Sequence, residues 1–331
     1  MRAIDIHAHM VPQALWVAAD AGQEWHGIRV ERDAGGWDWP VSGGERHRLG
    51  PKDRWTPEQR LADMSTLGVD IQVLSLVPGS YNYHLEPQVT LGMARETNDE
   101  IAQMAQSWPQ NFAGFCTLPM QDIKAAVAEL ERGVTRLGLR GAIIGDHVNG
   151  RTFDDPEFLP FWKAAEEMRA LIFVHQGGET MVNQRIDRYH LPNTVGNLAE
   201  RAVTFASLVF GGVMDRFPDL KICLAHGGGT VCYGIGRMDR GWHVRPEART
   251  NLQNPPSTYV RRFYYDCLTH SEAALRFLLD TVGADRVVLG TDWPADMSID
   301  WPVSWIQSLD SLTQQEKDLI LWKNLERILG V

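Results

Sequence analysis

The chain has 331 residues, of which 44% are hydrophobic and 22% are charged, a balance typical of a globular protein with a large core. These proportions exclude a disordered or collagen-like chain. The formal net charge is −10, from 32 Lys and Arg against 42 Asp and Glu, and no basic block interrupts it, so nucleic acid is not an expected partner.

Eight short apolar runs, bounded by turn signals, predict strands that are buried on both faces. In chain order they are Ala3–His9, Val69–Val77, Phe112–Pro119, Leu139–Val148, Leu171–Gly178, Leu220–Gly228, Phe263–Thr269 and Arg286–Pro294. Helical patterns lie between and after them, at Pro57–Leu67, Gln88–Ser107, Ile123–Leu137, Phe158–Ala170, Val195–Phe210, Ser271–Val282 and Gln314–Leu329.

Strands that alternate with helices in this way predict an α/β fold, namely a (β/α)8 TIM barrel that forms one domain over residues 1–331. An open doubly wound sheet is the structural alternative, although no GxGxxG turn follows the first strand. The barrel predicts that catalytic side chains gather at the carboxyl ends of the strands.

The first connection is far longer than an ordinary loop. It spans about residues 11–55 and contains five of the 12 tryptophans, which are Trp16, Trp25, Trp37, Trp39 and Trp55. We expect this loop to form a lid over the site. The alternative is an apolar flap that packs on the barrel or on another subunit.

Candidate metal ligands stand at the ends of four predicted strands. His7 and His9 are two residues apart on the first strand, so both imidazoles are expected to face the barrel interior. His175, His226 and Asp292 stand at or near the ends of the fifth, sixth and eighth strands. Such donors predict one catalytic divalent site, with Zn²⁺ as the first expectation and Mn²⁺ as the second. The alternative is a set of separately hydrogen-bonded strand ends, and spacing alone does not say which histidine stays unligated.

This ordered set resembles the amidohydrolase superfamily, of the amidohydrolase-2 type, over the whole chain. More narrowly, the sequence is similar to the family of 2-amino-3-carboxymuconate-6-semialdehyde decarboxylases and related metal-dependent decarboxylases. The segments that carry this resemblance are LAHGGG at Leu224–Gly229, GRMDRGW at Gly236–Trp242, PPSTYVRRFYYD at Pro255–Asp266 and DRVVLGTDWP at Asp285–Pro294.

The resemblance implies a role for each candidate. The implied metal ligands are His7, His9, His175 and Asp292. His226 then stands beside the metal as the catalytic acid or base, and Asp292 assists it. The fourth strand contains no lysine in Ile143–Val148, whereas many binuclear members have a carboxylated lysine there, so one metal ion is expected rather than two.

Two arginines are expected to bind substrate carboxylates. Alignment of the WTPEQR segment with the family places Arg48 at a substrate-binding position, although its neighbours Arg46 and Arg54 leave the register open. Arg237 follows the sixth-strand histidine at the family spacing. In the family this second arginine is supplied across a dimer contact, so a homodimer is implied. The alternative for each is a solvated surface charge.

The remaining histidines and the cysteines receive weaker predictions. His84, His190 and His270 are candidate substrate contacts, and His147 is either another such contact or a strand cap. The histidines expected to be solvated are His26, His47 and His243. The cysteines lack a CxxC pair and are expected to be buried free thiols.

The predicted function is a metal-dependent, non-oxidative decarboxylation that releases CO2 from an aromatic or unsaturated carboxylate, either carboxymuconate semialdehyde-like or hydroxybenzoate-like. One alternative is a hydrolase or hydratase that acts on a lactone, an amide or an unsaturated acid. Another is a catalytically silent barrel, against which the intact set of donors argues. The expected partner is a small carboxylate substrate. A cytoplasmic protein without a membrane partner is expected, because the sequence has no long apolar run and no signal-peptide pattern.

Overall fold

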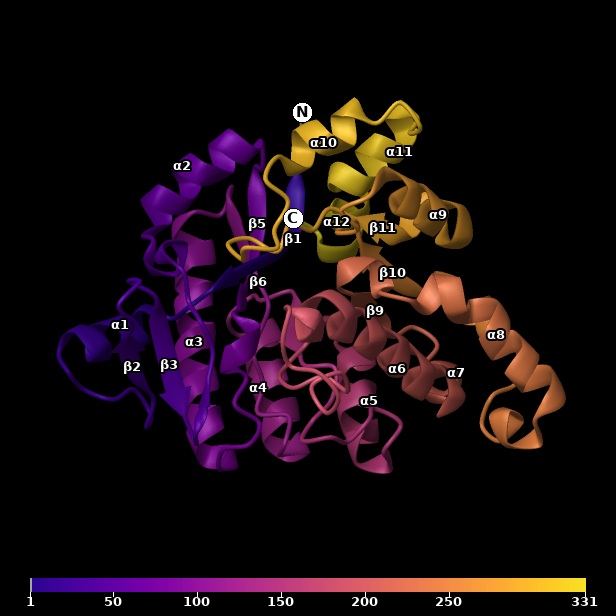
Figure 1. Ribbon diagram of the computed structural model, residues 1–331, viewed down its shortest axis with the longest axis horizontal. Helices are drawn as coiled ribbons and strands as arrows, with labels where there is room; N and C mark the ends of the chain where they lie inside the picture. The colour runs from indigo at the N-terminus through magenta and orange to yellow at the C-terminus, as the bar shows by residue number, and fades with distance from the viewer. Residues whose placement is uncertain (1) are drawn as a thin grey trace.

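The computed structural model describes residues 2–331; Met1 lies outside the described residues. Eight parallel strands alternate with helices around a central barrel (Figure 1). The strands are β1 (Ile4–Met10), β5 (Ile71–Leu76), β6 (Phe112–Gly114), β7 (Gly141–Ile144), β8 (Leu171–Val174), β9 (Lys221–Leu224), β10 (Phe263–Asp266) and β11 (Val287–Val288). Each lies within a predicted strand or overlaps it, and all residues of β1, β5, β7 and β8 are buried as expected.

Hydrogen bonds connect the strands in the order β1-β5-β6 and β11-β10-β9-β8-β7. Two further contacts link these sheets. The Cys116 N–H donates to the Gly141 carbonyl at 2.8 Å beside β6 and β7, and the Ile6 N–H donates to the Leu289 carbonyl at 3.0 Å beside β1 and β11. The eight strands therefore form the predicted barrel rather than an open doubly wound sheet.

Helices cover the outside of the barrel (Figure 1). They are α2 (Pro57–Leu67), α3 (Pro87–Ser107), α4 (Ile123–Thr135), α5 (Leu159–Glu167), α6 (Asn197–Phe210), α7 (Val213–Arg216), α8 (Val231–Val244), α9 (Glu272–Val282), α10 (Pro302–Ser308), α11 (Gln314–Asp318) and α12 (Asn324–Leu329). The first and last residues of helix α2 can be predicted from the sequence because capping signals stand at both ends. The Thr56 side chain caps the Gln59 N–H, Pro57 opens the first turn, and Gly68 ends the helix at a φ of 75°.

Helix α8 was not predicted. Its sequence contains three glycines, at positions 234, 236 and 241, and each weakens a helix relative to alanine. Packing of its first residues, Val231 and Cys232, against the barrel outweighs that cost. Ile235, Met238 and Trp242 also pack on the core, and the C-terminal end of α8 lies farthest from the barrel (Figure 1).

The first connection is folded rather than a plain loop. It contains α1 (Gln13–Asp20) and an antiparallel sheet of β2 (Arg29–Arg32), β3 (Asp38–Ser42) and β4 (Glu45–Arg46). We call residues 11–55 the insertion. Trp16 and Trp25 are buried in its own small core, which packs on Met93 of α3. These two tryptophans therefore stabilise the insertion instead of covering the site.

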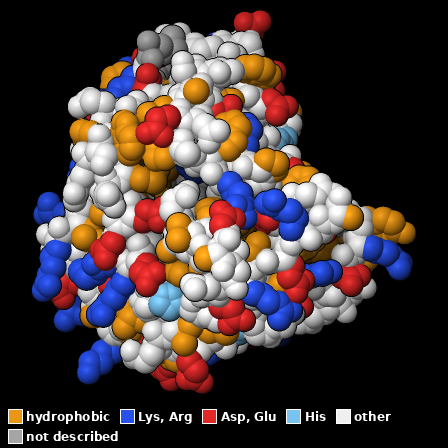
Figure 2. All heavy atoms as spheres, turned by 90° about the vertical axis from the view of Figure 1, so that its left-hand side faces the viewer, with side chains coloured by type: hydrophobic (Ala, Val, Ile, Leu, Met, Phe, Trp, Pro, Cys, Tyr) orange, Lys and Arg blue, Asp and Glu red, His pale blue; other side chains and the backbone are white. Residues whose placement is uncertain are grey.

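The face that carries the insertion shows acidic and basic side chains interspersed (Figure 2). The mixture agrees with the absence of a basic block in the sequence. All four cysteines are buried and free, as predicted. None of the helices in residues 2–331 is both long enough and apolar enough to span a bilayer.

Candidate metal centre and active site

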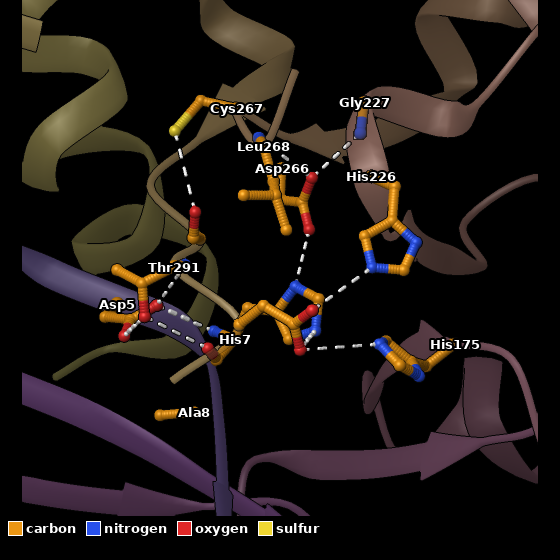
Figure 3. Close-up of polar contacts among 12 residues, drawn as sticks. Asp5, His7, Ala8, His175, His226, Gly227, Asp266, Cys267, Leu268 and Thr291 are labelled. Atoms are coloured by element: carbon orange, nitrogen blue, oxygen red, sulfur yellow. Dashed lines mark hydrogen bonds and ion pairs between the residues drawn. The ribbon is translucent and has the colours of Figure 1, made fainter. Parts of the chain in front are cut away.

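Four side chains converge on one point at the carboxyl end of the barrel. Nε2 of His7 and Nε2 of His9 lie 3.1 Å apart at the end of β1. Oδ1 of Asp292 lies 3.2 Å from the first of these nitrogens and 3.1 Å from the second. His175 follows β8, and its Nε2 lies 3.9 Å from the same oxygen. The four ligand atoms all lie within 4.8 Å of one another, and Figure 3 shows His7 and His175 pointing toward one another.

The donor set fits one divalent cation. Nε2 of His175 is buried and has no hydrogen-bond partner among the described residues. Burial lowers the pKa of His9 to about 4 and, together with the charge of His7, lowers the pKa of His175 well below its usual value. Both imidazoles are therefore neutral at physiological pH, and each can offer a nitrogen lone pair to a metal ion. Three imidazoles and one carboxylate match a catalytic metal site.

The other ring nitrogen of each histidine is held by a partner. The pairs are His7 Nδ1 with Asp266 Oδ2 at 2.8 Å, His9 Nδ1 with Ser75 Oγ at 3.2 Å, and His175 Nδ1 with the Gln176 carbonyl at 3.2 Å. Such contacts fix the ring orientation and the tautomer of a metal-binding histidine. They turn all three Nε2 atoms toward the centre.

Asp266 was missed by the sequence reasoning. It ends β10, is fully buried, and accepts hydrogen bonds from the Gly227 N–H at 2.8 Å and the Leu268 N–H at 3.2 Å (Figure 3). Burial raises its pKa, but the hydrogen bond from His7 and these backbone donors hold the pKa below the ordinary value. Its place as a lone acidic residue within the seventh predicted strand, Phe263–Thr269, was the available signal.

A second buried carboxylate ties β1 to the loop that carries Asp292. Asp5 accepts from the His7 N–H at 2.9 Å, and its other partners are the N–H and the hydroxyl of Thr291, at 3.1 and 2.7 Å (Figure 3). Gly290 lets the strands approach closely, because a Cβ there would lie 2.6 Å from Cβ of Asp266. This packing holds His7 and Asp292 together.

His226 lies beside the four converging side chains but outside their cluster. Its Nε2 is 3.7 Å from Oδ2 of Asp292, so the two carboxylate oxygens face different partners. Its backbone φ is 57°, and the three glycines that follow also have positive φ, which places the imidazole on a tight turn after β9. Its buried Nδ1 has no partner among the described residues. His226 is therefore placed to exchange protons beside the metal ligands.

A cavity of about 530 Å³ opens on these ligands and is lined by His9, His175 and Asp292. We call it the arginine lobe, because Arg48 of the insertion also lines it. The guanidinium of Arg48 stacks over Trp37 at 4.2 Å and donates to Asp296 Oδ2 at 2.6 Å. The structure thus places Arg48 in the same cavity as three of the candidate metal ligands.

The neighbouring arginines make other contacts, so the structure favours Arg48 among the three arginines that the sequence left open. Arg46 stacks over Trp39 at 4.9 Å on β3. Arg54 pairs with Asp38 at 2.8 Å and stacks over Trp16 at 4.2 Å. Of the three, Arg48 is the one whose side chain lines the arginine lobe.

Arg237 is not brought to the site of its own chain. It is exposed on α8, which leads away from the barrel, and it lines neither the arginine lobe nor the space next to His226 within the described chain (Figure 1). The expected role in a neighbouring subunit is not tested by a single chain.

The expectation that His47 is solvated is wrong. The insertion folds back, so His47 is half-buried, lines the arginine lobe and lies 3.3 Å from Ser80 Oγ. His190 also lines this lobe, whereas His84 lies 3.6 Å from Glu45. His147 contacts the Glu179 carbonyl at 3.1 Å.

The sequence matches the amidohydrolase family model over residues 4–331. The chain belongs to the amidohydrolase family. Among curated relatives of this amidohydrolase, a 2-amino-3-carboxymuconate-6-semialdehyde decarboxylase of Dictyostelium discoideum is 35% identical over 99% of this chain and 91% of that protein.

Two solved structures extend the comparison. The 5-carboxyvanillate decarboxylase from Sphingomonas paucimobilis has a TM-score of 0.83 and 25% identity, and the match covers 100% of this chain and 99% of the other. A 5-carboxyvanillate decarboxylase from Novosphingobium aromaticivorans, complexed with manganese and 4-hydroxy-3-methoxy-5-nitrobenzoic acid, has a TM-score of 0.75 and 26% identity. That match covers 82% of this chain and 80% of the other.

Replacing Asp266 by asparagine is expected to weaken metal binding by this amidohydrolase by roughly 10- to 100-fold, because the His7 tautomer is no longer fixed by a carboxylate. The measurement is a competition titration against a chromophoric chelator. Asp285→Asn is the matched control, since that half-buried aspartate pairs with Arg261 away from the site. Equal metal affinity of the two variants would contradict the orienting role.

Proposed function

We propose that this amidohydrolase is a metal-dependent, non-oxidative decarboxylase of an aromatic or unsaturated carboxylate. The observation that carries the proposal is that the two oxygens of the Asp292 carboxylate face different groups. Oδ1 lies 3.1 to 3.9 Å from the three inward Nε2 atoms, and Oδ2 lies 3.7 Å from His226. A proton-transfer group therefore stands directly beside the metal ligands. The decarboxylase names of the relatives support the same reaction.

In this proposal His7, His9, His175 and Asp292 hold one divalent ion. A bound ion of this kind supplies a Lewis acid that binds and polarises a substrate oxygen. Zinc is the proposed metal because three of the four donors are imidazoles. Elemental analysis of the purified protein is expected to find one equivalent of zinc per chain. Finding manganese instead, the metal in the Novosphingobium aromaticivorans complex, would overturn the zinc assignment.

His226 supplies the proton that decarboxylation consumes. Protonated on Nε2, it transfers the proton to the substrate carbon that bears the carboxylate. The bond to the carboxyl carbon then breaks, CO2 leaves, and the electron pair of that bond restores the π-system. The reaction consumes one carboxylate and one proton, and it yields one C–H bond and one CO2. Asp292 Oδ2 orients the imidazole, and solvent returns its proton.

Arg48 holds the substrate carboxylate in the arginine lobe. In the free protein its guanidinium is occupied by Asp296 at 2.6 Å, and a substrate carboxylate would share or replace that contact. Trp37 supports the guanidinium from its other face. The expected anion therefore meets a preformed cation next to the metal ligands.

Arg48→Ala is expected to raise KM by about 10- to 100-fold with little change in kcat, because a charge-assisted hydrogen bond of about 1.5–3 kcal/mol is lost from substrate and transition state alike. Steady-state rates of CO2 release measure both constants. Arg46→Ala is the matched control and should keep the KM of the parent protein. If the two variants show the same KM, the carboxylate binds elsewhere.

We also propose a homodimer in which Arg237 completes the site of the neighbouring subunit. Its exposed position on α8 supports this arrangement. Arg237→Ala and His226→Ala proteins should each be nearly inactive. Mixing them under conditions that exchange subunits should restore activity, because a mixed dimer contains one site with His226 and a neighbouring Arg237. A mixture as inactive as its components would exclude a shared site.

The test of the function is CO2 release from a small panel of acids, with metal-loaded and chelated protein side by side. The panel contains 2-amino-3-carboxymuconate semialdehyde and benzoates with an ortho hydroxyl or amino group. Release that chelation abolishes is the expected result. Cleavage of lactones or amides without CO2 release from any panel member would instead favour a hydrolase.

A further inference from the structure

A second cavity adjoins the metal ligands on the side of His226. It measures about 390 Å³, and His226 and Asp292 form part of its wall. It shares Asp292, Asn193 and Met297 with the arginine lobe, so the two cavities meet at a proposed metal ligand. A substrate bound there has room to extend in both directions.

The walls of this second cavity are mainly apolar, and we call it the apolar lobe. Its apolar side chains include Cys232, Leu268, Ala274, Phe277, Leu278 and Met297. Leu268 and Leu278 are 4% and 3% exposed, so they form a fixed wall, whereas Phe277 is 48% exposed at the rim. Among the described residues that line it, Asp292 is the only carboxylate, and there is no lysine or arginine.

The arginine lobe has the opposite character. Its lining includes Arg48, Lys52, Asp53 and Asp296. A second carboxylate of a substrate in the apolar lobe would lose hydration without gaining a lysine or arginine of the same chain as a countercharge, which is costly. An alkyl or aryl group there would instead be removed from water, which is favourable. The arginine lobe therefore favours the charged end of a substrate, and the apolar lobe favours its apolar end.

We infer that the apolar lobe is a subsite for an uncharged alkyl or aryl substituent of the substrate, while the arginine lobe binds its carboxylate. The inference rests on the proposed function and narrows its substrate class. The preferred substrate is a carboxylate extended by an apolar substituent.

The experiment compares 2-hydroxybenzoates whose ring carries hydrogen, methyl, propyl or phenyl at one position. Each methylene buried in the lobe is expected to raise kcat/KM about fourfold, so the propyl compound should exceed the unsubstituted one by at least tenfold at the position that points into the lobe. The 4- and 5-substituted series are both measured, because either position is a candidate for that direction.

Ala274→Phe fills the lobe, and Ala273→Phe is its matched control. Both residues are exposed in the first turn of α9, but Ala274 lines the cavity whereas Ala273 does not. Ala274→Phe should reduce the ratio of kcat/KM for propyl over unsubstituted substrate by at least tenfold, and Ala273→Phe should leave that ratio unchanged. Equal ratios in the parent protein and both variants, or no gain from any substituent, would overturn the inference.

Binding of product analogues separates this inference from the proposed function. Calorimetric titration should show 4-propylphenol or 3-propylphenol binding at least tenfold more tightly than phenol, with the advantage lost in Ala274→Phe. If this preference holds but no carboxylate releases CO2, the decarboxylase proposal fails and the apolar subsite stands. If CO2 is released but propyl groups give no advantage, the subsite fails and the decarboxylase stands.

Discussion

His226→Ala is expected to lower kcat by about two to four orders of magnitude while the protein keeps its metal. The expectation follows from the position of the imidazole. Its Nε2 lies 3.7 Å from Oδ2 of Asp292, whereas the inward Nε2 atoms of the other histidines face Oδ1. Removing His226 therefore removes the proposed proton donor and leaves the four ligands in place. Steady-state rates together with metal content measure both effects.

Two comparisons sharpen this test. His270→Ala, at the rim of the apolar lobe, removes an imidazole that does not contact Asp292, and it should retain far more of the parent kcat. A His226→Ala protein purified without metal would contradict the assignment of His226 as an unligated residue. Turnover at the parent rate would contradict its role in proton transfer.

His175→Ala is expected to lose the metal and, with it, all measurable turnover. Nε2 of His175 is a fully buried nitrogen without a hydrogen-bond partner in the described chain, so its expected partner is the metal ion itself. Removal leaves three donors and a cavity where the ring was. Metal content after dialysis is the primary measurement, and thermal unfolding shows whether the chain still folds.

The control for this variant is His147→Ala, which removes a half-buried imidazole from the loop after β7. It should retain one equivalent of metal. Retention of tightly bound metal and activity by His175→Ala would mean that another residue, such as His226, completes the ligand set. That outcome would reverse the two histidine roles.

The fold was largely predictable because each strand is a short apolar run and several helices, such as α2, α4 and α9, have their own boundary signals. Helix α2 begins and ends at the predicted residues, Pro57 and Leu67, because Thr56 caps it and Gly68 stops it. The last strand is shorter than predicted. Residues 289–294 leave the regular ladder, because Thr291 bonds to the Asp5 side chain and Asp292 adopts a φ of 64°.

The convergence of His7, His9, His175 and Asp292 was predictable for a geometric reason. The carboxyl ends of the strands in a barrel meet on one face, whatever the distance along the sequence. The partners of these ligands were not predictable in the same way. Asp266 contacts a residue 259 positions away, and nothing in the local pattern identifies that pair.

The insertion shows a different limit of sequence reasoning. Its tryptophans predicted a lid, but Trp16 and Trp25 are buried in its own core and Trp37 stacks on Arg48 at the site. Its strands are only two to five residues long, and the buried positions of β3 are Asp38, Pro40 and Ser42 rather than large apolar residues, so they give little periodic signal. Lid motion, the homodimer, zinc and a cytoplasmic location stay predictions.

The most direct test of the central claim is decarboxylation in D2O, followed by NMR of the product. The account predicts one deuterium at the carbon that carried the carboxylate, one CO2 per product molecule, and loss of both after metal removal. Formation of this deuterated product about two to four orders of magnitude more slowly in His226→Ala than in the parent protein would connect proton delivery to the proposed donor. Product formation without CO2, or with oxygen from water in place of the carboxylate, would contradict a non-oxidative decarboxylase.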